Sequence, residues 1–256
     1  MLVCVAALST RSNVGKPNVA VRCSMPSDSA AVGASAELVL SEAAYAASAK
    51  SGAEEDTTGG KIWDSGRILA SVLQEDYASR LPGMTVLELG SGTGIGGLTA
   101  ALAGASVTLT DGSLGVLPLL EANVRVNGLS AQATVQRLRW GHTHDLADLD
   151  QRVDLVIGSD LLYSPDVFPD LLDTLEELCT PSHTEILVCR PSSHLLSYLL
   201  TTPVRSTRAR TLQLCFPTRH TEGIFFDAVA DRGFSVDRYE EKEPCLFAAT
   251  LRWDAC

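Results

Sequence analysis

The sequence lacks a long apolar run, because no stretch approaches the roughly 20 residues that cross a membrane. Aromatic residues are scarce, at 5% of the 256 residues, yet hydrophobic residues make up 45%. The second value is that of a globular protein, and the length suits one α/β domain. We therefore expect a single folded domain with no membrane association.

Paired cysteines are also lacking. The seven cysteines include no Cys-x-x-Cys pair, and their number is odd. A disulfide framework and a zinc site are both unsupported. The five histidines show no metal-ligand spacing either; His142 and His144 come closest and are read as surface residues. We expect no metal ion, and reduced thiols in an intracellular compartment.

Positive charge is in deficit, with 20 basic against 31 acidic residues and a formal net charge of −11. Such a surface repels phosphate backbones. Nucleic acid is therefore not expected as a partner, unless a local basic patch outweighs the negative electrostatic potential of the surface. The simplest interpretation of this charge is solubility, and we expect a monomer.

Acidic residues are absent from the first 27 residues, which carry Arg11, Lys16, Arg22 and four serines. This composition is typical of an organellar transit peptide. The segment Val21-Arg22-Cys23-Ser24 resembles a plastid processing site. A disordered tail on a cytoplasmic protein is the alternative. Residues 1–35 are thus predicted to be a transit peptide or tail, and residues 36–256 the domain.

Beyond residue 35, predicted strands and helices alternate, which indicates a mostly parallel sheet covered by helices on both faces. A strand or short helix is expected within Ala36–Ala47. The last two predicted strands form an antiparallel hairpin. The predicted helices are Lys61–Ala78, Leu98–Ala103, Leu114–Val126, Asp166–Leu178 and Gly223–Arg232, and the strands are Met84–Leu89, Ser106–Thr110, Ala133–Leu138, Asp154–Ser159, Glu185–Cys189, Phe234–Tyr239 and Leu246–Trp253.

A glycine-rich turn, Gly90–Gly97, follows the first buried strand and begins with Gly90-Ser91-Gly92-Thr93-Gly94. Glycines there let the backbone approach a ligand closely. Asp111 ends the next strand, about 20 residues further on, where a carboxylate meets ribose hydroxyls. Glu88 replaces the apolar residue that usually precedes the turn in dinucleotide folds. The pattern predicts a nucleotide-cofactor site that includes Glu88, Gly90, Ser91, Gly92 and Asp111.

The segment from Glu88 to Gly94 resembles the first motif of class I, seven-strand methyltransferases. More narrowly, the chain resembles methyltransferase family 16, which includes protein-lysine methyltransferases. The resemblance covers about Gly60 to Cys189 and resumes near Thr218. Its further landmarks are Ile62-Trp63-Asp64-Ser65, Thr110-Asp111, Leu138-Arg139-Trp140-Gly141 and Ser159-Asp160-Leu161-Leu162-Tyr163.

The resemblance implies a Rossmann-like α/β fold with a mostly parallel seven-stranded sheet and an antiparallel C-terminal strand. It also implies S-adenosylmethionine as the cofactor and a protein lysine as the acceptor. The resemblance further implies that Asp160 and Tyr163 are the catalytic D-x-x-Y motif of the family, beside that acceptor. The residues implied to line the cofactor site are Trp63, Gly90, Ser91, Gly92, Asp111, Trp140 and Ser159.

The residues themselves leave other interpretations open. Trp63 and Trp140 are also read as plain core tryptophans, and Asp160 with Tyr163 as a polar hinge. A carboxylate such as Asp160 at a strand end is costly if it is buried without a partner, and a lysine ammonium would pair with it. The Tyr163 ring offers a face to the same cation. We expect no dedicated base, because desolvation lowers the amine pKa from its reference value of about 10.4.

One segment departs from the family. Residues 191–217 look inserted after the fifth parallel strand, and Pro191–His220 contains no acidic residue but has Arg205, Arg208, Arg210 and Arg219. The segment is either a substrate loop for an acidic partner or retained intron sequence. Because a fold does not fix its substrate, two alternatives to a lysine methyltransferase stay open. These are a small-molecule N-methyltransferase and a non-catalytic cofactor-binding protein.

Overall fold

The structure is a computed structural model that describes residues 8–10, 18–23, 36–42, 58–147, 149, 153–178, 185–189, 212–214, 228, 234–238 and 249–253. Side chains are described for 38–42, 58–147, 149, 153–178 and 228. The helices are α1 (Asp64–Glu75), α2 (Ile95–Leu102), α3 (Leu117–Val126), α4 (Thr143–Leu146) and α5 (Phe168–Leu178). The strands are β1 (Leu8–Thr10), β2 (Asn18–Cys23), β3 (Ala36–Ser41), β4 (Thr85–Leu89), β5 (Ser106–Asp111), β6 (Ala133–Arg137), β7 (Leu155–Ser159), β8 (Glu185–Cys189), β9 (Leu212–Leu214), β10 (Phe234–Arg238) and β11 (Ala249–Trp253).

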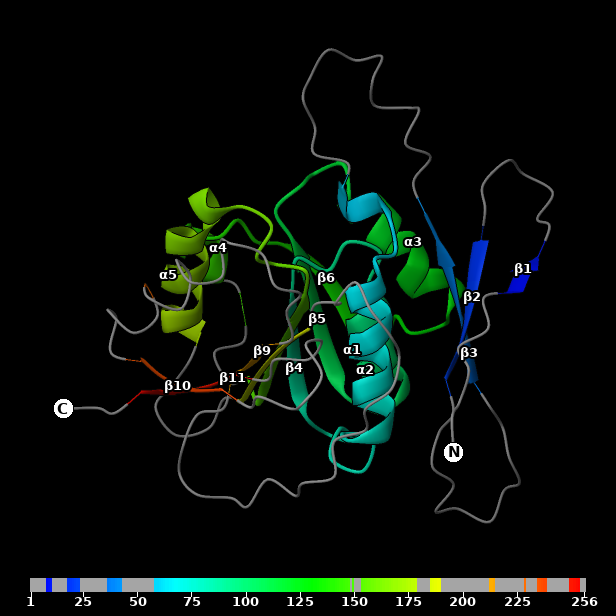
Figure 1. The fold of residues 1–256 in the computed structure, drawn as a ribbon. Helices are drawn as coiled ribbons and strands as arrows, with labels where there is room; N and C mark the ends of the chain where they lie inside the picture. Colours follow the sequence, from blue (N-terminus) through cyan, green and yellow to red (C-terminus); the bar gives the residue numbers. More distant parts are fainter. Residues whose placement is uncertain are drawn as a thin grey trace.

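The central sheet has the order β6-β5-β4-β7-β8-β9, and every neighbouring pair is parallel (Figure 1). In chain order this is the doubly wound arrangement, in which the strand order reverses between β4 and β7. Open sheets of this type bind ligands at that reversal, outside the carboxyl ends of the strands. The fold class predicted from the sequence is confirmed, and the sheet order places a ligand site after β4 and β7.

The prediction of a seven-stranded sheet with an antiparallel strand needs correction. In the described part of the chain the main sheet has six strands, all parallel. β10 and β11 are antiparallel as predicted, but they form a separate two-stranded sheet, with β11 close to β9. The reason is that β9 pairs with β8 and takes the edge position. The predicted helix Gly223–Arg232 lies outside the described residues, apart from Ala228.

β9 falls inside the predicted insertion, residues 191–217. This segment therefore contributes an edge strand to the sheet, in addition to any role as a substrate loop. Nothing else in the described residues bears on whether it is a loop or intron-derived, and both interpretations stay predictions.

Alternate residues of each central strand face two different cores, as the period of a strand requires. Val86 and Leu155 face the core beneath α1, α2 and α3. Leu87 and Val156 face the core beneath α5. Figure 1 shows α4 and α5 on the opposite side of the sheet from α1 and α2. The predicted layering, with helices on both faces, is confirmed.

Helix α2 begins earlier than predicted, at Ile95 instead of Leu98. The sequence placed Gly96 and Gly97 in the turn because glycine is a poor helix former. In the structure the two glycines let α2 pack closely on β4 and β5. A Cβ atom on Gly97 would lie 2.9 Å from Glu88 Oε2 and 3.1 Å from Val107 Cγ1. Packing at this point outweighs helix propensity.

The N-terminal region contains a three-stranded antiparallel sheet of order β1-β2-β3. β1 and β2 fall within residues 1–35, the predicted transit peptide or tail, and that interpretation stays a prediction. β3 decides the open choice at Ala36–Ala47 in favour of a strand. Its residues Leu38 and Leu40 are buried in the core beneath α1, α2 and α3. No helix in the described part of the chain is long and apolar enough to cross a membrane.

Candidate functional site

The glycine turn after β4 has a backbone that only glycine adopts readily. Gly90, Gly92 and Gly94 have φ angles of 57°, 54° and 83°. The turn is also crowded, since a Cβ on Gly90 would lie 2.9 Å from Leu161 Cδ2 and 3.5 Å from Trp140 Cζ2. Glycine at these positions therefore brings the bare backbone against the neighbouring loops.

The turn is hydrogen-bonded to the end of β5 through buried groups. Ser91 donates its N–H to the Thr110 carbonyl at 2.8 Å, and its hydroxyl accepts from Thr110 N at 2.9 Å. The Thr110 hydroxyl in turn donates to the Glu88 carbonyl at 2.7 Å. These bonds continue the pairing of β4 with β5 beyond the last ladder residue. Ser91 is therefore a structural anchor of the turn.

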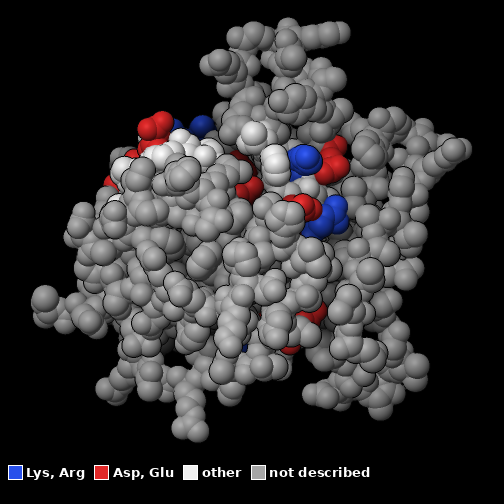
Figure 2. All heavy atoms as spheres, in the orientation of Figure 1, with Lys and Arg blue, Asp and Glu red and all other residues white. Residues whose placement is uncertain are grey.

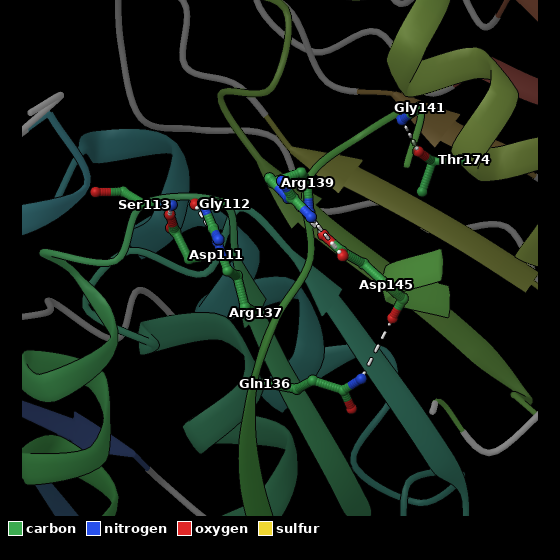
Figure 3. Close-up of polar contacts among 9 residues, drawn as sticks. All are labelled: Asp111, Gly112, Ser113, Gln136, Arg137, Arg139, Gly141, Asp145 and Thr174. Atoms are coloured by element: carbon green, nitrogen blue, oxygen red, sulfur yellow. Dashed lines mark hydrogen bonds and ion pairs between the residues drawn. The ribbon is translucent and has the colours of Figure 1, made fainter. Parts of the chain in front are cut away.

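The Asp111 carboxylate joins the turn to the loop after β5. Its Oδ2 accepts from Gly92 N at 3.0 Å, and its Oδ1 accepts from Ser113 N at 2.9 Å. Figure 3 shows the second of these contacts. A carboxylate can accept about four hydrogen bonds. Asp111 can therefore anchor the backbone and also receive the hydroxyl groups of a ligand.

A short segment that the sequence analysis missed, Thr58–Gly60, lies against the turn as a single 3-10 turn. A Cβ on Gly92 would lie 2.7 Å from the Gly59 carbonyl oxygen, and one on Gly59 would lie 3.5 Å from Asp111 Oδ2. Trp63 holds this segment, because its Nε1 donates to the Thr58 carbonyl at 3.1 Å. The two glycines close before Trp63 were the available signal. Trp63 remains 42% exposed, which excludes the core interpretation.

The two chain neighbours of Trp140, Arg139 and Gly141, are each held by hydrogen bonds that Figure 3 shows. The Arg139 guanidinium donates two 2.9 Å hydrogen bonds to the Asp145 carboxylate and holds the pKa of that carboxyl well below its usual range. On the other side, Gly141 N donates to the hydroxyl of buried Thr174 at 2.9 Å. The half-buried indole is thus held with its Cζ2 edge near Gly90. Nothing in the sequence pattern had pointed to Thr174.

The end of β7 lies beside the glycine turn at the reversal of strand order. Asp160 follows it with a φ of 57°, and it is the one non-glycine in the described chain with a positive φ. Aspartate adopts this conformation more readily than most residues, but it still costs energy, and such residues gather at functional sites. Ser159 lies close to α1, since a Cβ on Gly66 would be 3.6 Å from its Oγ.

Tyr163 completes the rim of the site. It is 53% exposed, and its ring centroid lies 6.4 Å from that of Trp140 at an angle of 41°. The two preceding residues, Leu161 and Leu162, are buried, so the loop carrying Asp160 and Tyr163 is anchored in the core. The rigid anchoring argues against a simple polar hinge.

Glu88 is set apart from the other predicted site residues. Its side chain shares the face of Val86 and lies beneath the first turn of α2, against Gly96 and Gly97. It is 2% exposed, and its Oε2 has no hydrogen-bond partner. Burial raises the pKa of Glu88 to about 8; the nearby amides of Gly97 and Gly96 and the Ser91 hydroxyl oppose this, and the Asp111 charge adds to it. The geometry makes Glu88 a buried neutral acid that supports the turn.

The remaining predicted residues do gather at the carboxyl edge of the sheet. Among the described atoms visible in Figure 2, Lys and Arg lie next to Asp and Glu, without a continuous basic area.

The fold and the site together define a Rossmann-like nucleotide-cofactor domain. Its three features are a doubly wound parallel sheet, a glycine turn where the strand order reverses, and an acid at the end of the adjacent strand.

Comparison with known proteins assigns the domain more closely. Residues 48–197 match the family described as lysine methyltransferase. The chain belongs to this family. It is 39% identical over 132 residues to protein N-lysine methyltransferase METTL21A of Mus musculus, and 37% identical over 136 residues to EEF1A lysine methyltransferase 3 of Mus musculus. These matches cover 50% and 51% of this chain and 59% and 55% of the relatives.

The match therefore spans between half and two thirds of the length of these two relatives. Among solved structures, it resembles the crystal structure of magnesium protoporphyrin IX methyltransferase (ChlM) from Synechocystis PCC 6803 with bound SAM. That resemblance has a TM-score of 0.45 and 21% identity, and it covers 73% of this chain and 79% of that one.

The position of Asp111 predicts a specific loss of cofactor affinity. Asp111→Ala removes one hydrogen bond to the glycine turn, one to the loop after β5, and the carboxylate predicted to meet the ligand. We expect S-adenosylhomocysteine binding to weaken by about 1–3 kcal/mol in a calorimetric titration, the scale of charge-assisted hydrogen bonds.

Asp154→Ala is the matched control, because Asp154 Oδ2 accepts from Thr85 N at 2.8 Å at the opposite edge of the sheet. That variant should lose stability and keep its affinity. Equal affinities for the Asp111→Ala variant and the wild type would contradict this site.

The raised pKa of Glu88 predicts how stability depends on pH. The folded protein binds the Glu88 proton up to about pH 8, whereas the unfolded chain releases it near 4.5. The folded state thus holds more protons between these values, so the free energy of unfolding falls as pH rises through this window. Glu88→Gln should abolish this contribution and be more stable than wild type at pH 9.

Urea unfolding at pH 5, 7 and 9 measures the effect. Glu121→Gln, an exposed carboxylate on α3, is the control and should follow the wild type at every pH. If the curves of wild type and Glu88→Gln run parallel over this range, the buried neutral acid is not present.

Proposed function

We propose that this chain transfers a methyl group from S-adenosylmethionine to a lysine side chain of a protein. Membership of the lysine methyltransferase family supports the reaction class. The main support is that two groups of residues meet where the strand order of the sheet reverses. One group is the glycine turn with Asp111, and the other is Asp160 with Tyr163. Trp140 lies between them, since its Cζ2 would be 3.5 Å from a Cβ on Gly90 and its ring centroid is 6.4 Å from that of Tyr163.

The residues present fit the proposed cofactor. The turn after β4 has a left-handed backbone at Gly90, Gly92 and Gly94, as glycine-rich nucleotide-binding turns do, and the Asp111 carboxylate suits a ribose diol. Trp140 offers an aromatic face for an adenine ring. When bound, S-adenosylmethionine supplies an activated methyl group. The protein's task is then to align the acceptor amine, which is the main contribution to such a displacement.

The acceptor half of the site suits a lysine. The Asp160 carboxylate attracts the ammonium group during docking, and the Tyr163 ring provides a face for the same cation. Once the docked partner covers the rim, desolvation lowers the amine pKa against the opposite effect of the Asp160 charge, and this favours loss of the proton to water. This scheme uses no dedicated base.

The open rim supports a protein over a small molecule as the acceptor. Trp63 and Tyr163 are 42% and 53% exposed, and Leu114 in the loop after β5 is 58% exposed. Small-molecule pockets enclose most of their ligand. Exposed aromatic and aliphatic side chains around a site mark a surface that a larger partner covers. METTL21A and EEF1A lysine methyltransferase 3 carry names that describe protein substrates.

Asp160 provides the sharpest test of the reaction. Asp160→Asn keeps the side-chain size and tolerates the left-handed backbone, so only the charge is lost. We expect methylation to fall roughly 10- to 100-fold, the equivalent of a hydrogen bond to a charged group, with cofactor affinity unchanged.

The assay incubates the protein with tritiated S-adenosylmethionine and an extract of cells from the same organism, which is then resolved by size. Asp166→Asn is the control, because Asp166 is an exposed carboxylate. A labelled protein band lost in Asp160→Asn and kept in Asp166→Asn supports the proposal. A label that enters only small molecules, or wild-type turnover by Asp160→Asn, would refute it.

We also propose that the protein is targeted to plastids and that it is a monomer. The acid-free first 27 residues support plastid targeting, and the net charge of −11 supports the monomer. Residues 1–35 fused to a fluorescent protein should enter plastids. A fusion that stays in the cytosol would contradict plastid targeting and would leave the proposed reaction unaffected.

A further inference from the structure

The outer edge of β3 is paired with side chains from a helix. β3 is the edge strand of its sheet, and β2 occupies its other side. Asn127 accepts from Val39 N at 2.8 Å and donates to the Val39 carbonyl at 2.8 Å. In the same way, Asn123 accepts from Ser41 N at 2.9 Å and donates to the Ser41 carbonyl at 3.2 Å. Each amide thus makes the two hydrogen bonds that a residue of a neighbouring strand would make.

The spacing of the two asparagines explains why this pairing fits. Four residues along a helix rise about 6 Å, and two residues along a strand span about 6.6 Å. Asn123 on α3 and Asn127, the residue that caps its C-terminus, therefore match Ser41 and Val39 on β3. The pair satisfies backbone groups that an open strand edge would leave exposed.

The two asparagines differ in one further contact. Asn127 sends its remaining hydrogen bond to the Asn123 carbonyl, within α3, at 2.7 Å. Asn123 Nδ2 instead donates to the Thr93 carbonyl at 2.9 Å, inside the glycine turn. Asn123 is fully buried, at 0% exposure, and Thr93 is 2% exposed. Asn123 therefore joins β3, α3 and the turn through one side chain.

We propose that Asn123 is a positioning residue for the cofactor, which couples the docking of β3 to cofactor binding. The inference rests on the proposed function, because it assigns the glycine turn to S-adenosylmethionine. The turn contains three glycines with positive φ, and such a backbone has many alternative conformations. A fixed Thr93 carbonyl removes some of this freedom before the ligand arrives, which favours binding. By linkage, the bound cofactor stabilises the docked β3 to the same extent.

The matched variants are Asn123→Leu and Asn127→Leu, measured as full-length chains. Each removes one two-point pairing with β3 and keeps a similar side-chain volume, so both should lower the melting temperature. Only Asn123→Leu releases Thr93. Its dissociation constant for S-adenosylhomocysteine should rise about tenfold, the scale of one buried hydrogen bond, while that of Asn127→Leu stays within about twofold of wild type.

Equal affinity in all three chains would overturn the inference, as would equal weakening in both variants, which would show a general stability effect. If the wild type itself does not bind S-adenosylhomocysteine, the proposed function fails, and this inference fails with it. Binding by wild type with no difference between the variants refutes the role of Asn123 alone.

Hydrogen exchange on the unaltered chain tests the coupling even if Asn123→Leu does not fold. S-adenosylhomocysteine should slow exchange in residues 36–42 as well as in the glycine turn, relative to α5 as the reference. Slower exchange that is confined to the turn and the loop after β5 would overturn the inference.

Discussion

The hydrogen bonds between the glycine turn and the end of β5 are the interaction on which the rest of the site depends. Ser91 and Thr110 exchange two of them, and Asp111 accepts a third from Gly92. A turn with three left-handed glycines has little conformational preference of its own. The neighbouring strand therefore imposes the shape that a ligand meets, and Asp111 takes part in both the turn and the ligand site.

The same constraint explains the packing beneath the turn. With β4 held next to β5, α2 approaches both strands so closely that Gly96 and Gly97 have no room for a Cβ. Glu88 fills the space under that helix turn, and burial keeps its carboxyl neutral at physiological pH. Cofactor turn, helix start and buried acid thus form one packed unit. Asn123 and the Thr58–Gly60 segment bring the N-terminal region against the same unit.

The sequence predicted the parts of this arrangement that follow from local pattern. Strand β8 was predicted with its observed bounds, and the glycine turn, Asp111 and the loop after β7 were placed at the correct edge of the sheet. The assignment from local sequence pattern was wrong where tertiary packing outweighs helix propensity. It read Gly96 and Gly97 as turn residues, because their role depends on Glu88 and Leu109 across the core. It also missed Thr174 and Asn123, since a single polar residue in a helix does not reveal its distant partner. The edge position of β9 was unpredictable for a related reason: a three-residue strand has no pattern of its own.

The central claim is that the turn after β4 and the Asp111 carboxylate form a site for S-adenosylmethionine. The most direct measurement is a calorimetric titration of S-adenosylhomocysteine into the purified wild-type chain, with adenosine triphosphate and a nicotinamide dinucleotide titrated in parallel. We expect saturable binding of S-adenosylhomocysteine at one site per chain, and no binding of the other two nucleotides at the same concentrations. Absence of heat with S-adenosylhomocysteine from a folded protein, or preferential binding of either other nucleotide, would contradict it.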